Sequence, residues 1–258
     1  RLVSSVAAEI LRAAAQARSD DPRREGNVVH LPDSAELWAT GDVHGHRPAL
    51  TKTLAAAALS AHPRRVVLFQ EIIHGPVDAR SGHDRSAELL VRGARAMVQQ
   101  PDQVLMLLAN HDVAQITANE ITKQGRRVCQ DFNEGVAYAY RGEAPEVLDA
   151  IDEFLRSLPL AVRCPNGVLL THSLPTPKRM DRAGTEILHR PIRDEDLRRP
   201  GPVYEWTWGR KQTAEQTDRL ADELDVSLFA LGHKKLSAGW DTLPPRTVYL
   251  ATDSDHGA

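Results

Sequence analysis

The chain has only two cysteines among its 258 residues, Cys129 and Cys164. They fit no CxxC metal pattern, and they give no reason to expect a disulfide framework. The formal net charge is only −3, so the sequence offers no electrostatic argument for a nucleic-acid partner. No apolar run approaches the roughly 18 residues of a membrane span, and no apolar core of a signal peptide is present. We therefore expect no membrane partner, and a reducing, cytoplasmic setting is the default expectation.

From Glu36 onward the chain has short apolar runs that alternate with helical patterns. The apolar spacing predicts four clear helices, over Pro48–Ala61, Ser86–Gln99, Pro145–Ser157 and Thr213–Leu224. The tail predicts strands in KLSAGW and RTVYLAT, whereas a simple doubly wound sheet would end in a helix. Alternating strands and helices indicate an α/β fold. We expect a two-sheet β-sandwich core that is flanked by helices.

The first 27 residues are predicted to form a part of their own. Apolar residues between positions 2 and 16 repeat with helical spacing on one face, and the polar, turn-rich segment RSDDPRREGN follows. This pattern predicts an N-terminal helical arm and linker at 1–27 and a single domain at 28–258. The arm is expected to pack on the outside or to mediate homo-oligomer formation.

Five short motifs follow one another along the chain, each at or just after the end of an apolar run: GDVHGH (41–46), QEIIHGP (70–76), ANHD (109–112), THS (171–173) and LGH (231–233). Active-site groups of α/β proteins collect beyond the ends of strands, so we expect the five motifs to meet in the fold. Together they offer two acids, one amide and several imidazoles. This donor set suits two divalent metals that share a carboxylate, and it predicts a dinuclear metallophosphoesterase.

The first and third motifs supply most of this argument. Asp42 and His44 are two residues apart in an extended segment, so their side chains project to the same side and can close on one ion. Alternatively, Asp42 caps the following helix and His44 lies on the surface. In ANHD, Asn110 offers a neutral oxygen ligand and His111 can face the substrate, whereas a simple Asn-His turn is the alternative.

The last two motifs are weaker when taken singly. His172 and His233 each follow an apolar strand that breaks into a turn of small residues. A lone histidine after a strand is more often structural than a metal ligand. Their order behind the first three motifs makes both of them candidate ligands.

At these five motifs the chain resembles the calcineurin-like metallophosphoesterases. It resembles most the phosphoprotein (Ser/Thr) phosphatase branch, with its bacterial members that act on phosphoproteins or dinucleoside polyphosphates. The resemblance covers about residues 36–253. It implies two divalent ions (Mn, Fe or Zn) and direct attack on phosphorus by a water or hydroxide held between them. Residue by residue, it implies Asp42 and His44 on the first metal, Asn110, His172 and His233 on the second, Glu71 between the two, and His111 as the general acid.

The second motif departs from the family pattern GDxxDRG. Glu71 takes the position of the bridging Asp, and its longer side chain can still span two ions. His74 stands where the family has the Asp that orients the general acid, and the phosphate-binding Arg of the family is missing. His74 could hydrogen-bond His111 or contact phosphate directly. Arg80 and Arg210 are the candidate replacements for the missing cation.

Three functions remain open from the sequence. The first is a phosphomonoesterase of the Ser/Thr protein phosphatase type, with a phosphoprotein as its substrate. The second is a hydrolase of nucleotide anhydrides such as dinucleoside polyphosphates, which would use the same metal site. The third is a weakened descendant that binds metal or a phosphorylated ligand without turnover. Every predicted metal position still holds a competent donor, which favours catalysis.

Overall fold

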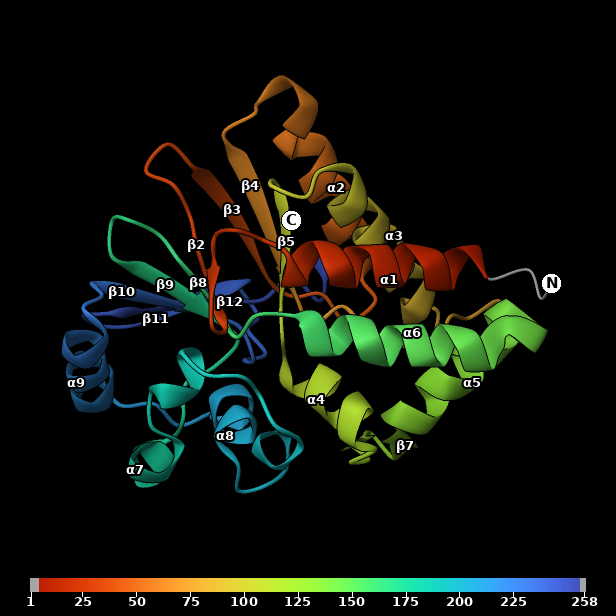
Figure 1. The fold of residues 1–258 in the computed structure, drawn as a ribbon. Coiled ribbons are helices and arrows are strands. Elements are labelled where there is room, and N and C mark those ends of the chain that lie inside the picture. Colours follow the sequence, from red (N-terminus) through yellow and green to blue (C-terminus); the bar gives the residue numbers. More distant parts are fainter. Residues whose placement is uncertain (1–4, 256–258) are drawn as a thin grey trace.

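A computed structural model describes residues 5–255 as a mixed α/β fold (Figure 1). One sheet has three strands in the order β3-β4-β5, with β3 at Glu36–Asp42, β4 at Arg65–Gln70 and β5 at Val104–Leu107. Both pairs are parallel. The carboxyl ends of the three strands therefore lie at one edge, and the motifs that follow them begin there.

A larger sheet has seven strands in the order β1-β2-β8-β9-β10-β12-β11. Its strands are β1 Arg24–Glu25, β2 Val28–His30, β8 Ala161–Arg163, β9 Val168–Thr171, β10 Leu228–Leu231, β11 Trp240–Leu243 and β12 Thr247–Leu250. The central strands β9, β10 and β12 run parallel, so the THS and LGH motifs also emerge at one edge. A small hairpin, β6 Thr122–Lys123 and β7 Arg126–Arg127, stands apart from both sheets.

The two sheets share a buried apolar cluster. Val66 and Leu68 of β4 lie in it together with Val162 of β8 and Leu170 of β9. Successive side chains of a strand point to opposite faces, and Phe69 accordingly belongs to the other cluster, which includes helical residues. The mixed α/β class predicted from the sequence is confirmed, whereas the sandwich arrangement of the two sheets stays a prediction.

Helices cover the sheets and form a layer of their own (Figure 1). The structure has α1 Val6–Ser19, α2 Arg47–Ala57, α3 Ser86–Gln99, α4 Asn110–Thr117, α5 Val128–Tyr140, α6 Ala144–Ser157, α7 Met180–Ala183, α8 Pro202–Trp208 and α9 Ala214–Leu224, with short 3-10 turns at Leu59–Ala61, Arg141–Glu143, Pro177–Arg179, Glu186–Leu188 and Asp194–Leu197. The four helices expected from apolar spacing are all present. No helix among residues 5–255 is long and apolar enough to cross a membrane.

The helix expected as an arm lies along α6 and α3 (Figure 1). Its residues Leu11 and Ala14 are fully buried in the main core cluster. The stretch expected as a linker is also attached to the rest of the fold. Buried Arg18 pairs with Asp21 at 2.9 Å and donates to the carbonyl of Pro101 at 2.6 Å. The helix is therefore integrated into the helical layer. The domain boundary at residue 28 and the role in association stay predictions.

One strand prediction was wrong. KLSAGW was expected to be a strand, but only its last residue, Trp240, belongs to β11. Gly239, with φ 78°, makes the turn that begins the strand there.

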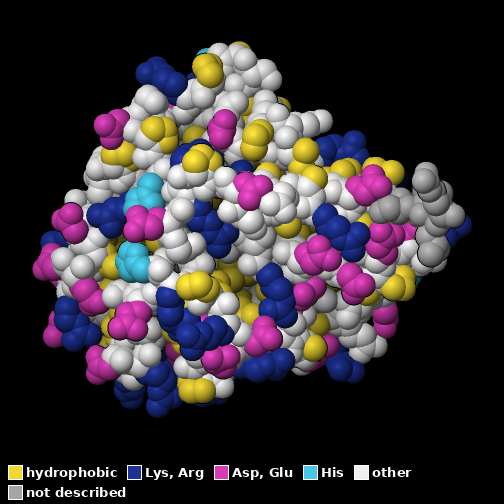
Figure 2. All heavy atoms as spheres, viewed as in Figure 1, with side chains coloured by type: hydrophobic (Ala, Val, Ile, Leu, Met, Phe, Trp, Pro, Cys, Tyr) yellow, Lys and Arg dark blue, Asp and Glu magenta, His cyan; other side chains and the backbone are white. Residues whose placement is uncertain are grey.

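On the face of the molecule shown in Figure 2, charged and hydrophobic side chains are interspersed.

Candidate active site

All five motifs converge at the carboxyl ends of strands. Asp42 is the last residue of β3, and Glu71 follows β4 directly. Asn110 opens α4 shortly after β5, while His172 follows β9. The last motif also lies beside the first one. His233, two residues after β10, donates its backbone amide hydrogen to Asp42 Oδ1 at 2.8 Å.

The backbone at this edge is strained at four residues. His44, Glu71, His74 and His233 all have positive φ, between 42° and 64°, a region that non-glycine residues rarely occupy. Such outliers cluster at functional sites, where the surrounding structure compensates for about 1–3 kcal/mol of strain each. Gly232 is required for another reason. A Cβ atom there would lie only 2.5 Å from Asp42 Oδ1.

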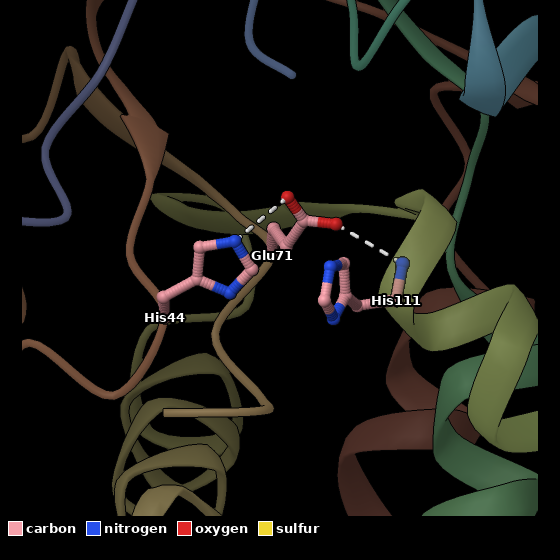
Figure 3. Close-up of side chains that lie close together, drawn as sticks. All are labelled: His44, Glu71 and His111. Carbon is pink, nitrogen blue, oxygen red and sulfur yellow. Dashed lines mark hydrogen bonds and ion pairs between the residues drawn. The ribbon is translucent and has the colours of Figure 1, made fainter. Parts of the chain in front are cut away.

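Glu71 lies at the centre of the site (Figure 3). Its Oε2 atom is 3.4 Å from His44 Nε2. Its Oε1 atom accepts a hydrogen bond from the His111 amide at 3.0 Å and lies 3.6 Å from His172 Nε2. The two oxygens of one buried carboxylate therefore face two different groups of histidines.

These contacts define two candidate ligand groups. In one, donor atoms of His44, Glu71 and His111 lie within 4.8 Å of one another, and in the other those of Glu71, His172 and His233 do so. Glu71 is common to both groups, as expected for a bridging carboxylate. The sequence places His111 outside the ligand set, whereas the geometry also allows it to bind the first ion.

The second group contains the amide as well. His172 Nε2 lies 2.8 Å from Asn110 Oδ1 and 3.1 Å from His233 Nδ1. On its other side, His172 Nδ1 is 2.9 Å from the side-chain oxygen of Gln70 and 3.7 Å from Asp42 Oδ1. Of the donors predicted for the second metal, His172 thus contacts both of the others.

Gln70 fixes the orientation of His172. Its amide nitrogen donates to the carbonyl of Thr40 at 2.9 Å, so its oxygen must face His172 Nδ1. That oxygen can only accept a hydrogen bond, and His172 therefore carries its proton on Nδ1. The lone pair on Nε2 then points at Asn110 and Glu71. Partners of this kind hold a ligating imidazole in its ring orientation and tautomer.

Replacing Gln70 with leucine is expected to weaken Mn²⁺ binding by about 10–100-fold, the usual cost of losing such a partner. The loss arises because, without Gln70, the His172 ring can carry its proton on either nitrogen, and only one of these two forms leaves Nε2 free to bind metal. Isothermal titration calorimetry measures the affinity, and Gln130→Leu, an exposed glutamine of α5, is the matched control. Equal Mn²⁺ affinity in both variants would contradict the role given to Gln70.

Burial sets the protonation of the imidazoles. It lowers the pKa of both His44 and His233 to about 3 and that of His74 to about 4. Burial, followed by the charges of neighbouring histidines, also lowers the pKa of His111 and of His172 well below the usual range. These rings are neutral near neutral pH, and the neutral imidazole is the form that binds metals.

The two carboxylates behave in the opposite way. Burial raises the pKa of Asp42 to about 6, and burial together with the charge of Asp42 raises the pKa of Glu71 well above its usual range. Two adjacent buried acids are costly unless cations compensate their charge. The Nε2 atom of His233 is also buried and has no hydrogen-bond partner among residues 5–255. Acids, neutral imidazoles and an amide that converge in this way fit divalent cations.

The predicted general acid and its partner are in contact. His74 Nδ1 lies 2.8 Å from His111 Nδ1, and both rings are buried. His74 is therefore a direct partner of the His111 ring at Nδ1. This placement is the one expected if His74 orients His111, although His74 also lines the adjoining cavity.

Only one of the two predicted arginines comes near the site. Arg80 is exposed in a loop that is pinned by a bridge between Val77 and Asp84, and it does not line the cavity next to the histidines. Arg210, just after α8, is exposed but near enough for its charge to act on Asp42 and His172.

Lys123 is a further candidate for binding phosphate that the sequence analysis did not identify. Lys123 of the β6–β7 hairpin lines a cavity of about 190 Å³ together with His44, His74 and Arg126. Its charge contributes to the lowered pKa values of His44, His74 and His111. The hairpin lies in the segment between ANHD and THS, which has no motif, so no sequence signal pointed to it.

No family model matches the sequence, and no curated protein matches it. Solved structures do match the fold. A serine/threonine phosphatase from Saccharomyces cerevisiae with similarity to human phosphatase PP5 matches with a TM-score of 0.71 and 17% identity, over 97% of this chain and 77% of that one. A cold-active protein tyrosine phosphatase matches with a TM-score of 0.61 and 17% identity, over 94% of this chain and 75% of that one. The chain therefore has a phosphatase-like fold, and the resemblance drawn from the motifs is confirmed at the level of the fold.

Proposed function

We propose that this protein hydrolyses phosphoesters with the help of two divalent cations. The observation that carries the proposal is the placement of Glu71, whose Oε2 faces His44 and whose Oε1 faces His172. The residues that would hold the ions are Asp42, His44, Glu71, Asn110, His172 and His233. The site would lie where the two sheets, as halves of a sandwich, present their strand ends to each other.

Two such cations, when bound, would make a water molecule acidic enough to act as a nucleophile near neutral pH and would neutralise charge on phosphate. The chain itself supplies the remaining chemistry. His111 is held with Nδ1 on His74, so its other nitrogen, Nε2, can accept the proton released by the attacking water and then give that proton to the leaving oxygen. The charge of Lys123 acts on His111 and that of Arg210 on His172, and both cations would balance the negative charge of the phosphate oxygens.

A monoester of a phosphoprotein is the substrate that we favour. The cavity beside His44 and His74 holds about 190 Å³, which accommodates a phosphate group, and the rest of a phosphoprotein would then lie outside it. The rings of Tyr204 and Trp208 are stacked, and the ring centroids of Trp208 and His233 lie 6.5 Å apart. Because aromatic faces stack on bases, this pair supports a dinucleoside polyphosphate as the second candidate substrate.

One assay separates the proposed functions. Phosphate release is measured from p-nitrophenyl phosphate, a phosphopeptide and a dinucleoside tetraphosphate, with Mn²⁺, Fe²⁺ or Zn²⁺ and again after chelation. Hydrolysis of the first two substrates that is lost on chelation supports a phosphomonoesterase. Preference for the third substrate supports the anhydride hydrolase. Binding of metal without turnover of any of them would leave only the non-catalytic descendant. A cytoplasmic location is part of the proposal and needs a separate test by fractionation.

Replacing Lys123 with alanine is expected to raise KM for phosphate esters roughly tenfold, because a charged hydrogen bond to phosphate is lost. The effect should shrink at high salt, since the side chain is exposed and screened. Lys52→Ala, an exposed lysine of α2, is the control. Steady-state kinetics at two ionic strengths provide the measurement, and a fall in kcat at constant KM would speak against phosphate binding by Lys123.

A further inference from the structure

A chain of side-chain contacts continues beyond the pair of histidines. His74 Nε2 lies 3.0 Å from the side-chain oxygen of Gln115, and the Gln115 amide nitrogen donates to Asn133 Oδ1 at 2.8 Å. His111 and Gln115 are one turn apart on α4, and Asn133 belongs to α5. None of the five motifs contains Gln115 or Asn133.

These contacts determine where the protons are. The Gln115 amide nitrogen Nε2 donates to Asn133, so the amide oxygen Oε1 is the atom that faces His74. An amide oxygen cannot donate, and His74 therefore carries its proton on Nε2. The neutral ring then offers a lone pair at Nδ1, and the short contact of 2.8 Å is a hydrogen bond donated by His111 Nδ1.

The proton on Nδ1 of His111 has a consequence for the site. The Nε2 atom of His111 is the nitrogen left for proton exchange, and ring rotation would cost the bond to His74. Without Gln115, His74 could carry its proton on Nδ1, where it would meet the proton of His111. A wrong tautomer of this kind costs a general acid–base residue much of its effect while leaving the fold intact.

We propose that Gln115 is a positioning residue that fixes the tautomer of His74 and, through it, the orientation of His111 toward the substrate. This proposal rests on the phosphoesterase function proposed above. Asn133 supports it by holding the Gln115 amide the right way round. The role needs an acceptor oxygen at this position, and glutamate could provide one as well as glutamine.

The test compares a substitution that removes the acceptor oxygen with one that keeps it. Gln115→Met keeps the length and removes the acceptor, whereas Gln115→Glu keeps an acceptor oxygen. We expect Gln115→Met to lower kcat for phenyl phosphate by about 10–100-fold with little change in KM, and to affect p-nitrophenyl phosphate much less, because p-nitrophenolate leaves without a proton. Gln115→Glu should stay within a few-fold of the unmodified protein. Gln130→Met on α5 is the matched control.

A second measurement does not depend on activity. Long-range proton–nitrogen NMR spectra of the ¹⁵N-histidine-labelled protein report the tautomer of each ring. We expect the protonated nitrogen of His74 to be Nε2 in the unmodified protein and in Gln115→Glu, and the Nδ1 form to appear in Gln115→Met. In a His111→Ala background, Gln115→Met should cost nothing further in activity, because coupled residues are not additive.

Three results would overturn the proposal. The first is an equal loss on both substrates, which indicates a structural role for Gln115. The second is a loss that adds fully to that of His111→Ala. The third is an Nδ1-protonated His74 in the unmodified protein. If the unmodified protein hydrolyses none of the substrates, the proposed function fails together with the catalytic role of Gln115, and the NMR result then shows whether the tautomer assignment holds by itself.

Discussion

Alanine at position 71 is expected to abolish phosphoester hydrolysis and to lower metal content from about two ions per chain toward none. Glu71 is the only carboxylate whose two oxygens face both groups of histidines among the described residues. In the proposed site its removal would take one ligand from each ion at once, whereas Asp42→Ala or Asn110→Ala would take a ligand from one. Turnover should fall by at least about 10⁴-fold, because the chemistry of both cations depends on their being held.

Elemental analysis after dialysis gives the metal content, and circular dichroism shows whether the fold is kept. Glu215→Ala is the matched control, since this glutamate is exposed on α9 and far from the five motifs in sequence. Glu71→Asp is informative because it restores the family residue with a shorter reach, and it should retain metal. Full metal content in Glu71→Ala, Asp42→Ala and Asn110→Ala would refute the ligand assignment.

Replacing His111 with alanine should lower kcat by about 10²–10⁴-fold for poor leaving groups such as phenolate, the usual contribution of a general acid. The loss should be much smaller for p-nitrophenolate, which leaves without a proton. If His111 instead binds the first ion, as its place in one ligand group allows, both substrates should suffer equally and metal content should fall. Kinetics on the two esters, with metal analysis, distinguish these roles.

His74→Asp tests the partner of His111. A carboxylate 2.8 Å from His111 would favour the protonated imidazole and raise its pKa, so the alkaline limb of the pH profile should move to higher pH. Activity should then hold or increase. If His74 contacts phosphate instead, the new carboxylate would repel a dianion, and KM would rise while the pH profile stayed in place.

The position of these side chains was predictable because strand and turn signals are local. RVVLF and QVLMLL are apolar runs that end two residues before Glu71 and Asn110, respectively, and each run became a parallel strand with its motif at the carboxyl end. The prediction of a strand over KLSAGW was wrong, because the strand begins only after the turn at Gly239.

Gln70 and Gln115 show what sequence patterns leave out. Gln70 stands directly before Glu71, yet its role depends on Thr40 in β3 and on His172, which follows β9. Gln115 follows His111 at a spacing of four, a spacing that places both on one helix face, but its partner His74 comes from another segment. Contacts across elements arise from packing, and local composition does not encode them.

By itself the sequence determined the α/β class, the strand ends and the donors of the candidate metal site, because these follow from hydrophobic periodicity and from the few residue types that bind divalent ions. Tertiary structure decided the rest. It brought Lys123 over the cavity and left Arg80 in an exposed loop, and it built α1 into the helical layer. It also placed His74 in contact with His111, with Gln115 as its acceptor. These outcomes depend on how distant segments pack, and a side chain acquires its partner and its proton only when that packing is complete.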